Sequence, residues 1–310
     1  MKHPSVGIAV ITHRAKHHLP KCLPPLLKSP LKPRVLVVNS SSHDGTVELA
    51  QELGAETLVI PRKEFNHGAT RELARKHLGT EIIVMITPDA YAVDHSVVEK
   101  LIHPLANGHA SVAYARQLPH DGATFFEAFA RNFNYPREGH IRSFQDVPHF
   151  GVYSIFCSNS CAAYLNRALD EVNGFPTVLL GEDTFTVARL LEKGHRIAYT
   201  PEAQIKHSHS YNLVQEFKRN FDTGIAREQH KDIIAKYGKD EKRGRTYVKE
   251  MGKQLWKEKP HLLPFAALRI LICWLGYKVG KASLKAPLWW KKLCTSQDFY
   301  WTSDHYKKKT

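Results

Sequence analysis

Short apolar runs rich in β-branched residues alternate with helical patterns along the N-terminal half of the chain. The runs lie at residues 6–12, 35–39, 57–60, 82–87 and 111–115, and the helical patterns lie at 18–27, 46–53, 69–77 and 96–106. Runs without polar alternation are typical of parallel strands that helices cover on both faces. The pattern predicts βαβ units and an α/β fold with a mostly parallel central sheet and helices on both faces.

The second half of the chain is less regular. Residues 119–152 are rich in aromatic and charged side chains and show little periodicity, so we expect a long excursion over the ligand site. Beyond it the sequence predicts helices at 165–172, 184–193 and about 213–237, and strands at 196–200 and 204–209.

Polar residues gather where the predicted strands end, at residues 12–14, 39–46 and 87–90. In open α/β sheets the ligand binds outside the carboxyl ends of the strands. We therefore expect the functional site at this edge of the sheet.

The formal net charge of +14 is unevenly distributed. Residues 236–310 hold 18 Lys and Arg against 6 Asp and Glu, together with all 5 Trp, which leaves residues 1–235 at only +2. This predicts a nearly neutral globular body, 1–235, followed by a basic, Trp-rich helical tail, 236–310. Because the charge lies outside the body and no known binding signature appears, we expect no nucleic acid as a partner.

The five cysteines form neither a CxxC pair nor a zinc spacing, which favours a reducing compartment over a disulfide framework. The N-terminus runs directly into the first apolar segment without the features of a signal peptide. We therefore expect a cytoplasmic location.

The tail contains an apolar segment, 262–277, interrupted by Arg269. Its 16 residues are fewer than the roughly 20 needed to span a bilayer, so we do not expect it to cross one. Lysines interleave with tryptophans here, as in interfacial helices that lie among anionic headgroups. The alternative is a helical pair packed on the body with a solvated basic face. The residues concerned are Arg269, Lys278, Lys281, Lys285, Lys291 and Lys292, with Trp274, Trp289 and Trp290.

Five short motifs occur in a fixed order: ITHR at 11–14, NSSSHDGT at 39–46, FNHGATR at 65–71, TPDA at 87–90, and GF, GED and HSH within 174–209. Together they resemble the family 2 glycosyltransferases of GT-A fold, most closely the bacterial rhamnosyltransferase branch. The resemblance implies a catalytic domain at 1–235, with a nucleotide-binding half at about 1–115 and an acceptor-binding half at 116–235. It also implies inverting sugar transfer from a nucleotide-diphosphate donor.

The resemblance further implies a divalent metal, Mg²⁺ or Mn²⁺, held by Asp89 and by His207 or His209. A cation beside the leaving diphosphate offsets the negative charge that develops there. The family usually places an acidic cluster at this position, whereas this sequence offers a single carboxylate. The alternatives are that Asp89 caps a turn and that His209 is an ordinary surface histidine.

The acidic pair that opens the helix at 184–193 matches the family's catalytic position. We expect Asp183 to be the base that removes the acceptor hydroxyl proton, with Glu182 binding the acceptor or tuning the pKa of Asp183. The alternative is that both acids stabilise the start of the helix.

The remaining motifs match the family's nucleotide-sugar contacts. Thr12, Arg14 and Pro88 belong to this set. Asn39 stands where an Asp is common, but its carbonyl can still accept from a pyrimidine. Asn66, His67 and Arg71 open a helix whose N–H groups suit phosphate or sugar oxygens, and Arg71 could reach the diphosphate. The alternative for this motif is a tight turn.

The leading hypothesis is transfer of L-rhamnose from dTDP-rhamnose to a lipid-linked or lipopolysaccharide-type glycan, at the inner face of the cell membrane. A UDP-sugar transferase and a catalytically impaired scaffold of a glycan-assembly complex are the alternatives. A sugar-nucleotide pyrophosphorylase would require a Gly-rich signature after the first strand, and residues 11–14 contain no glycine. The sequence does not predict the oligomeric state.

Overall fold

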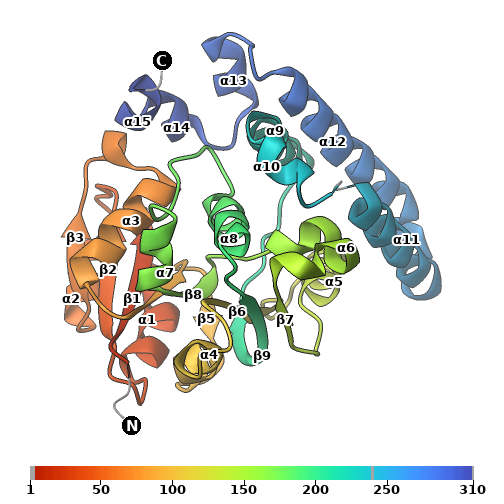
Figure 1. Ribbon diagram of the computed structural model, residues 1–310. Coiled ribbons are helices and arrows are strands. Elements are labelled where there is room, and N and C mark those ends of the chain that lie inside the picture. Colours follow the sequence, from red (N-terminus) through yellow and green to blue (C-terminus); the bar gives the residue numbers. More distant parts are fainter. Residues whose placement is uncertain (1–3, 239–240, 309–310) are drawn as a thin grey trace.

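The computed structural model describes residues 4–238 and 241–308, whose centre is a nine-stranded mixed sheet in the order β3-β2-β1-β4-β8-β6-β9-β5, with β7 paired to β9 (Figure 1). The strands are β1 (Val6–Thr12), β2 (Arg34–Asn39), β3 (Glu56–Val59), β4 (Ile82–Ile86), β5 (Tyr91–Ala92), β6 (Val112–Leu118), β7 (His140–Arg142), β8 (Cys161–Leu165) and β9 (Ile197–Lys206).

Helices separate and follow these strands (Figure 1). They are α1 (Leu19–Leu27), α2 (Thr46–Glu52), α3 (His67–Leu78), α4 (Val97–Ala106), α5 (Phe125–Asn134), α6 (Val147–Phe150), α7 (Asn166–Glu171), α8 (Glu182–Glu192), α9 (Leu213–Gln229), α10 (Lys231–Ala235), α11 (Glu241–Glu258), α12 (Leu263–Ala282), α13 (Leu288–Cys294), α14 (Asp298–Thr302) and α15 (Asp304–Lys307).

The α/β arrangement of the first half is confirmed, because β1, β2, β3 and β4 pair in parallel with helices between them. Two hydrophobic cores lie on opposite faces of the sheet. Alternate residues of β1 enter different cores: Ala9 and Ile11 face one, and Ile8 and Val10 face the other. Burial on both faces explains why the strand sequences show no polar alternation.

The second half of the sheet is mixed. Strand β8 lies antiparallel between β4 and β6, while β6 and β9 are parallel. The strands expected at 196–200 and 204–209 form one strand, β9, whose register against β6 shifts at Ala115. This strand ends at Lys206, one residue before the first of the two histidines expected to close it.

The expectation of an irregular excursion at 119–152 was wrong, because this stretch contains α5, β7 and α6. Helix α5 begins with a capping box formed by Thr124 and Glu127. Its phenylalanines at 125, 129 and 133 are spaced four residues apart and stack along one helix face. The aromatic content that looked irregular is therefore the apolar face of an amphipathic helix.

The tail packs on the body rather than extending from it. Helix α12 lies along α9 (Figure 1), and glycines on both helices allow the close approach. A Cβ atom on Gly224 would lie 2.2 Å from the backbone oxygen of Tyr277, and one on Gly280 would lie 2.1 Å from that of Phe221. Near the end of the chain, α14 returns to the segment before α3 (Figure 1).

Within the described residues, Pro260–Ala282 forms a 23-residue helical segment that is, by length and composition, long and apolar enough to cross a membrane, since it contains an 18-residue stretch with a mean hydropathy of 1.6. The helical segment is therefore longer than the 16-residue apolar run expected from the sequence, because the helix continues through Lys278 and Lys281. Arg269 does not face outward as expected. Its guanidinium is hydrogen-bonded to the Glu216 carboxylate on α9 and lies over the ring of Phe126.

Candidate active site

A cavity of about 790 Å³ opens at the carboxyl ends of β1 and β4, as the positions of the polar motifs predicted. Its walls come from the loops after β1, β4 and β9, from the loop before β8, from the start of α8 and from one face of α9. The predicted site residues that line it are Thr12, Arg14, His67, Arg71, Pro88, Asp89, Glu182, Asp183, His207 and His209.

Asp89, His207 and His209 lie together on one side of this cavity. Their ligand atoms all fall within 4.8 Å of one another. The Oδ2 atom of Asp89 is 3.4 Å from Nε2 of His207 and 3.6 Å from Nδ1 of His209. Atoms that share an ion at about 2.1 Å lie roughly 3 to 3.5 Å apart, so this spacing fits a single divalent cation.

The ring of His207 is held from behind by Gln117. The buried His207 donates from Nδ1 to Oε1 of Gln117 at 2.9 Å, and the same oxygen accepts from Nη1 of Arg131 at 2.8 Å. A proton on Nδ1 leaves the lone pair of Nε2 directed at Asp89, which is how ligating histidines are commonly oriented. Sequence reasoning missed Gln117, although it is the one uncharged polar residue at the end of the apolar β6 run that pairs with β9.

The electrostatics of this cluster favour an ionised carboxylate. Burial alone would raise the pKa of Asp89, but the contact with His207, together with the positive charge that His207 and His209 carry when protonated, lowers it well below its usual range. Burial, aided by the neighbouring His207, lowers the pKa of His209 to about 4. His209 is therefore neutral near pH 7 and its ring nitrogen can act as a ligand.

Asp183 lines the same cavity from the first turn of α8. Its carboxylate accepts from the backbone N–H groups of Asn159 at 3.2 Å and of Thr184 at 2.7 Å. Burial, followed by the negative charge of Glu182, raises the pKa of Asp183 to about 6. The residue thus stabilises the helix start and still presents a carboxylate of increased basicity to the cavity.

The side chain of Glu182 already has partners within the protein, so its geometry does not favour binding of the acceptor, which was one of the two roles expected for it. Its carboxylate is buried, lies 2.8 Å from Nη1 of Arg71, and accepts from Nδ2 of Asn159 at 3.1 Å. Although burial opposes ionisation, the charge of Arg71 keeps the pKa of Glu182 below its usual value. The other expected role, tuning the pKa of Asp183, agrees with this geometry.

Asn159 is a second residue that sequence reasoning missed. Its backbone N–H bonds Asp183, its side-chain amide bonds Glu182, and its Oδ1 accepts from the hydroxyl of Tyr164 at 2.8 Å. One residue therefore sets the positions of both acids. Its signal in the sequence was the polar Ser-Asn-Ser triplet immediately before the apolar β8 run.

The motif at 65–71 is more structural than expected. Asn66 does not line the cavity: its Oδ1 caps α3 by accepting from the N–H groups of Gly68 and Ala69, and its Nδ2 donates to the oxygen of Val178. A Cβ on Gly68 would lie 1.9 Å from the oxygen of Pro176, so only glycine fits there. Arg71 reaches the cavity wall, but its pairing with Glu182 leaves it a poor match for the diphosphate contact that we expected.

Asn39 is also withdrawn from the cavity. Its amide donates to the hydroxyls of Thr12 at 3.2 Å and Ser42 at 2.8 Å, and its Oδ1 accepts from the N–H of Ser42. These bonds close the turn after β2, so the expected pyrimidine contact is not evident. In contrast, Arg14 is exposed at the cavity with φ of 51°, in the left-handed region.

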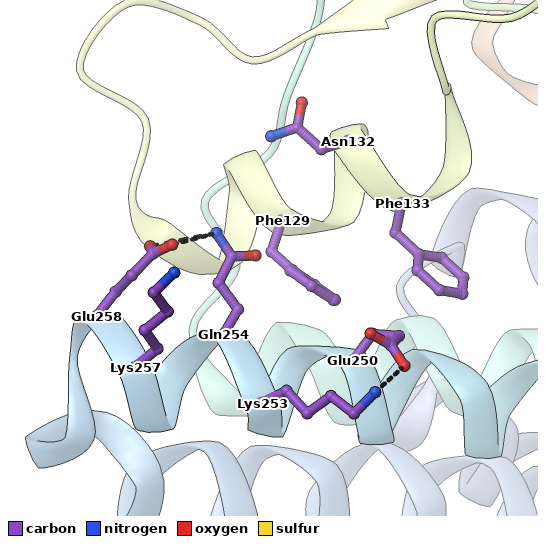
Figure 2. Close-up of a pocket in the computed structure, with 8 residues that line it drawn as sticks. All are labelled: Phe129, Asn132, Phe133, Glu250, Lys253, Gln254, Lys257 and Glu258. Carbon is purple, nitrogen blue, oxygen red and sulfur yellow. Dashed lines mark hydrogen bonds and ion pairs between the residues drawn. The ribbon is translucent and has the colours of Figure 1, made fainter.

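A second hollow of about 440 Å³ lies between α5 and α11 (Figure 2). Phe129 and Phe133 point into it from α5, and the polar residues of α11 around it pair with one another, as in Glu250 with Lys253 (Figure 2). Its lining contains neither a histidine nor an unpaired carboxylate. The hollow therefore lacks the groups needed for metal binding or acid–base chemistry.

Comparison with known proteins gives a consistent result. The model of the family Glycosyl transferase family 2 matches residues 7–172. The chain is 33% identical over 305 residues to the O-antigen chain rhamnosyltransferase RfbN of Salmonella typhimurium, covering 97% of each protein. It is 34% identical over 275 residues to the O-antigen chain rhamnosyltransferase WbaN of Salmonella anatum, covering 88% of this chain and 87% of the relative.

Solved structures of similar fold are more distant in sequence. The mannosyltransferase PcManGT from Pyrobaculum calidifontis, in complex with GDP-Man and Mn²⁺, aligns over 97% of this chain and 86% of its own with a TM-score of 0.58 and 17% identity. TarS of S. aureus in complex with UDP-GlcNAc aligns over 91% of each chain with a TM-score of 0.55 and 14% identity. These likenesses confirm the GT-A type fold.

Proposed function

The chain belongs to glycosyl transferase family 2, and from this premise we propose that it is an inverting, divalent-metal-dependent transferase. We propose that it moves L-rhamnose from dTDP-rhamnose to a lipid-linked or lipopolysaccharide-type glycan at the inner face of the cell membrane. The observation that carries the proposal is that a single cavity is lined both by the cluster of Asp89, His207 and His209 and by the carboxylate of Asp183.

The proposed cation would be held by the carboxylate of Asp89 and the imidazoles of His207 and His209. When bound, it supplies positive charge that stabilises the departing nucleoside diphosphate. Two imidazoles beside one carboxylate suit Mn²⁺ better than Mg²⁺, which usually keeps carboxylates, phosphates and waters as ligands. The ionised state of Asp89 and the fixed ring of His207 support this assignment.

In the proposed reaction Asp183 accepts the proton of the acceptor hydroxyl as that oxygen bonds to the anomeric carbon. The bond between this carbon and the diphosphate oxygen breaks on the opposite face, which inverts the configuration. A pKa of about 6 keeps Asp183 mostly ionised at neutral pH while making it a stronger base than an ordinary aspartate. Glu182, Arg71 and Asn159 act through Asp183 and are positioning residues.

The proposed donor rests on the two curated relatives, both called O-antigen chain rhamnosyltransferases. Thr12, Arg14 and Pro88 are proposed donor contacts because they line the same cavity as the metal cluster. A UDP-sugar donor is the alternative within the family, and a catalytically impaired scaffold is the alternative outside catalysis. The presence of a basic carboxylate and a metal-sized cluster in one cavity favours an active enzyme over the scaffold.

We also propose that the tail, 236–310, attaches the body, 1–235, to the membrane surface. The face of α12 opposite α9 is apolar and exposed, with Leu271 at 50% and Trp274 at 54% exposure. Lys278 and Lys285 flank this face and are exposed, as headgroup contacts would require. Lys291 is buried against Leu284 and Trp301, so it does not belong to the proposed contact.

The decisive experiment measures nucleoside-diphosphate release by the full chain over dTDP-, UDP- and GDP-sugars, with Mn²⁺ or Mg²⁺ and a membrane extract as acceptor source. We expect turnover of dTDP-rhamnose with Mn²⁺ and loss of at least a hundredfold in the Asp183→Asn variant with nucleotide binding retained. Turnover of a UDP-sugar alone would replace the donor assignment. If no donor is turned over while nucleotide binds, the scaffold is the correct function.

A further inference from the structure

The last segment of the chain contributes to the cavity. Gln297 and Phe299, which belong to the tail, line it together with residues of the N-terminal half. Nε2 of His67 lies 3.3 Å from Oε1 of Gln297, although the two residues are 230 positions apart in the sequence. The boundary expected at residue 235 therefore does not separate the cavity from the tail.

This segment is firmly anchored. The carboxylate of Asp222, fully buried on α9, accepts from both the N–H of Ser296 at 2.8 Å and the hydroxyl of Ser296 at 2.6 Å. Farther along, Tyr300 and Trp301 are buried in a small core with Phe221. The placement of Gln297 and Phe299 is thus fixed on both sides.

The segment also contacts the short 3₁₀ helix Arg62–Glu64 before α3. Nε2 of His305 lies 2.8 Å from the oxygen of Glu64, and Nζ of Lys63 lies 3.8 Å from the carboxylate of Asp304. These contacts hold the aromatic ring of Phe299 beside the side chain of Arg62.

Arg62 packs against two aromatic rings that contact each other, those of Phe65 and Phe299. Its Cζ is 4.5 Å from the ring centre of Phe299 and 5.1 Å from that of Phe65, and its Nη1 donates to the hydroxyl of Ser40 at 3.0 Å. Among the described residues no carboxylate lies within ion-pair distance of this guanidinium, and Asp298 acts on it only from farther away. A planar cation that is fixed by aromatic faces and has no directly paired carboxylate presents its remaining N–H groups to the cavity.

Gln297 fixes the state of His67. An amide oxygen only accepts, so the contact requires a proton on Nε2 of His67, which leaves Nδ1 as an acceptor when the ring is neutral. Burial and the charge of Arg71 lower the pKa of His67 to about 4, so the ring is neutral near pH 7. The neutral ring of His67, which lines the cavity, therefore carries its acceptor at Nδ1.

We propose that residues 295–299 complete the donor site: Arg62 binds an anionic oxygen of the nucleoside diphosphate, and Phe299 and Gln297 are positioning residues for Arg62 and His67. This inference rests on the proposed function, because it assigns the cavity to a nucleotide-diphosphate donor. The tail is then part of the catalytic unit as well as the proposed membrane contact.

The test is a double-mutant cycle on nucleotide binding by the full chain, measured by calorimetry with dTDP and Mn²⁺. Arg62→Ala and Phe299→Ala should each weaken binding about tenfold, and the double variant should also lose about tenfold rather than a hundredfold. Phe299→Tyr keeps the ring and should stay within about threefold of the wild type. Thr302→Ala, an exposed position on the same helix α14, is the matched control and should bind normally.

Additive effects of the two substitutions would overturn the inference, as would unchanged affinity in Phe299→Ala. Loss of affinity in Phe299→Tyr together with a lowered melting temperature would do so as well, because it would indicate a packing role. If the wild type binds none of dTDP, UDP and GDP with Mn²⁺, the proposed function fails and this inference fails with it.

Discussion

Nη1 of Arg71 and Oε1 of Glu182 lie 2.8 Å apart, and both side chains are almost completely removed from solvent. Removing one partner of a buried pair leaves an uncompensated charge, which costs about 3–5 kcal/mol. We therefore expect Arg71→Met to lower the free energy of unfolding by about that amount, measured by urea denaturation. Lys100→Met breaks the exposed pair with Asp94 and should cost about 1 kcal/mol or less. Equal losses of unfolding free energy in the two variants would show that the buried pair of Arg71 and Glu182 contributes no more to stability than an exposed pair does.

The raised pKa of Asp183 predicts the acidic limb of the pH profile. A base acts only when deprotonated, so kcat/KM should be constant above about pH 6 and should fall about tenfold for each pH unit below it. The measurement is kcat/KM for the donor between about pH 4.5 and 8, at saturating Mn²⁺ and with a check that the protein stays folded. A limb absent from this range would show that Asp183 is not the base.

Glu182→Gln should shift that limb to lower pH. The negative charge of Glu182 raises the pKa of Asp183, whereas Arg71 lowers it, and the substitution removes only the first effect. Asp183 then deprotonates at a lower pH, and the variant should retain relatively more of its maximal activity at about pH 5 than the wild type retains. A limb that stays in place would show that Glu182 does not act on Asp183 electrostatically.

The sequence was sufficient for the strands β1, β2, β3, β4 and β6 and for the approximate edge of the site, because uninterrupted apolar runs followed by polar residues have few other structural solutions. It was not sufficient for the partners of the motif residues. Whether Asn39 and Asn66 face a ligand or the backbone depends on which loops pack against them, and these contacts join residues such as Asn66 and Val178 across 112 positions. The return of Phe299 to the cavity depends on tertiary packing of the tail, for which no local pattern exists.

Gln117 should control metal affinity without touching the metal. Its Oε1 fixes the His207 ring, and loss of such a contact typically weakens metal binding about 10- to 100-fold. Gln117→Leu should therefore raise the dissociation constant for Mn²⁺ by that factor, measured by titration with detection of free Mn²⁺. Gln204→Leu, which loses only a contact to the oxygen of Pro201, is the control. Unchanged Mn²⁺ affinity in Gln117→Leu would exclude the proposed orientation of His207.

The exposed face of α12 predicts binding to an anionic bilayer. Leu271 and Trp274 are half exposed although both are large and apolar, and water contact at such positions is unfavourable by about 25 cal/mol for each Å². Leu271→Glu with Trp274→Glu replaces apolar area by charges that phosphatidylglycerol repels, so co-flotation with vesicles containing it should fall at least tenfold. Leu73→Glu, at an exposed apolar position on α3, is the matched control and should bind like the wild type.

Because Lys278 and Lys285 flank the apolar face, binding of the wild type should also weaken as salt rises from about 50 to 500 mM. Equal flotation of the double variant and the wild type would show that α12 does not contact lipid, whatever the enzyme's activity.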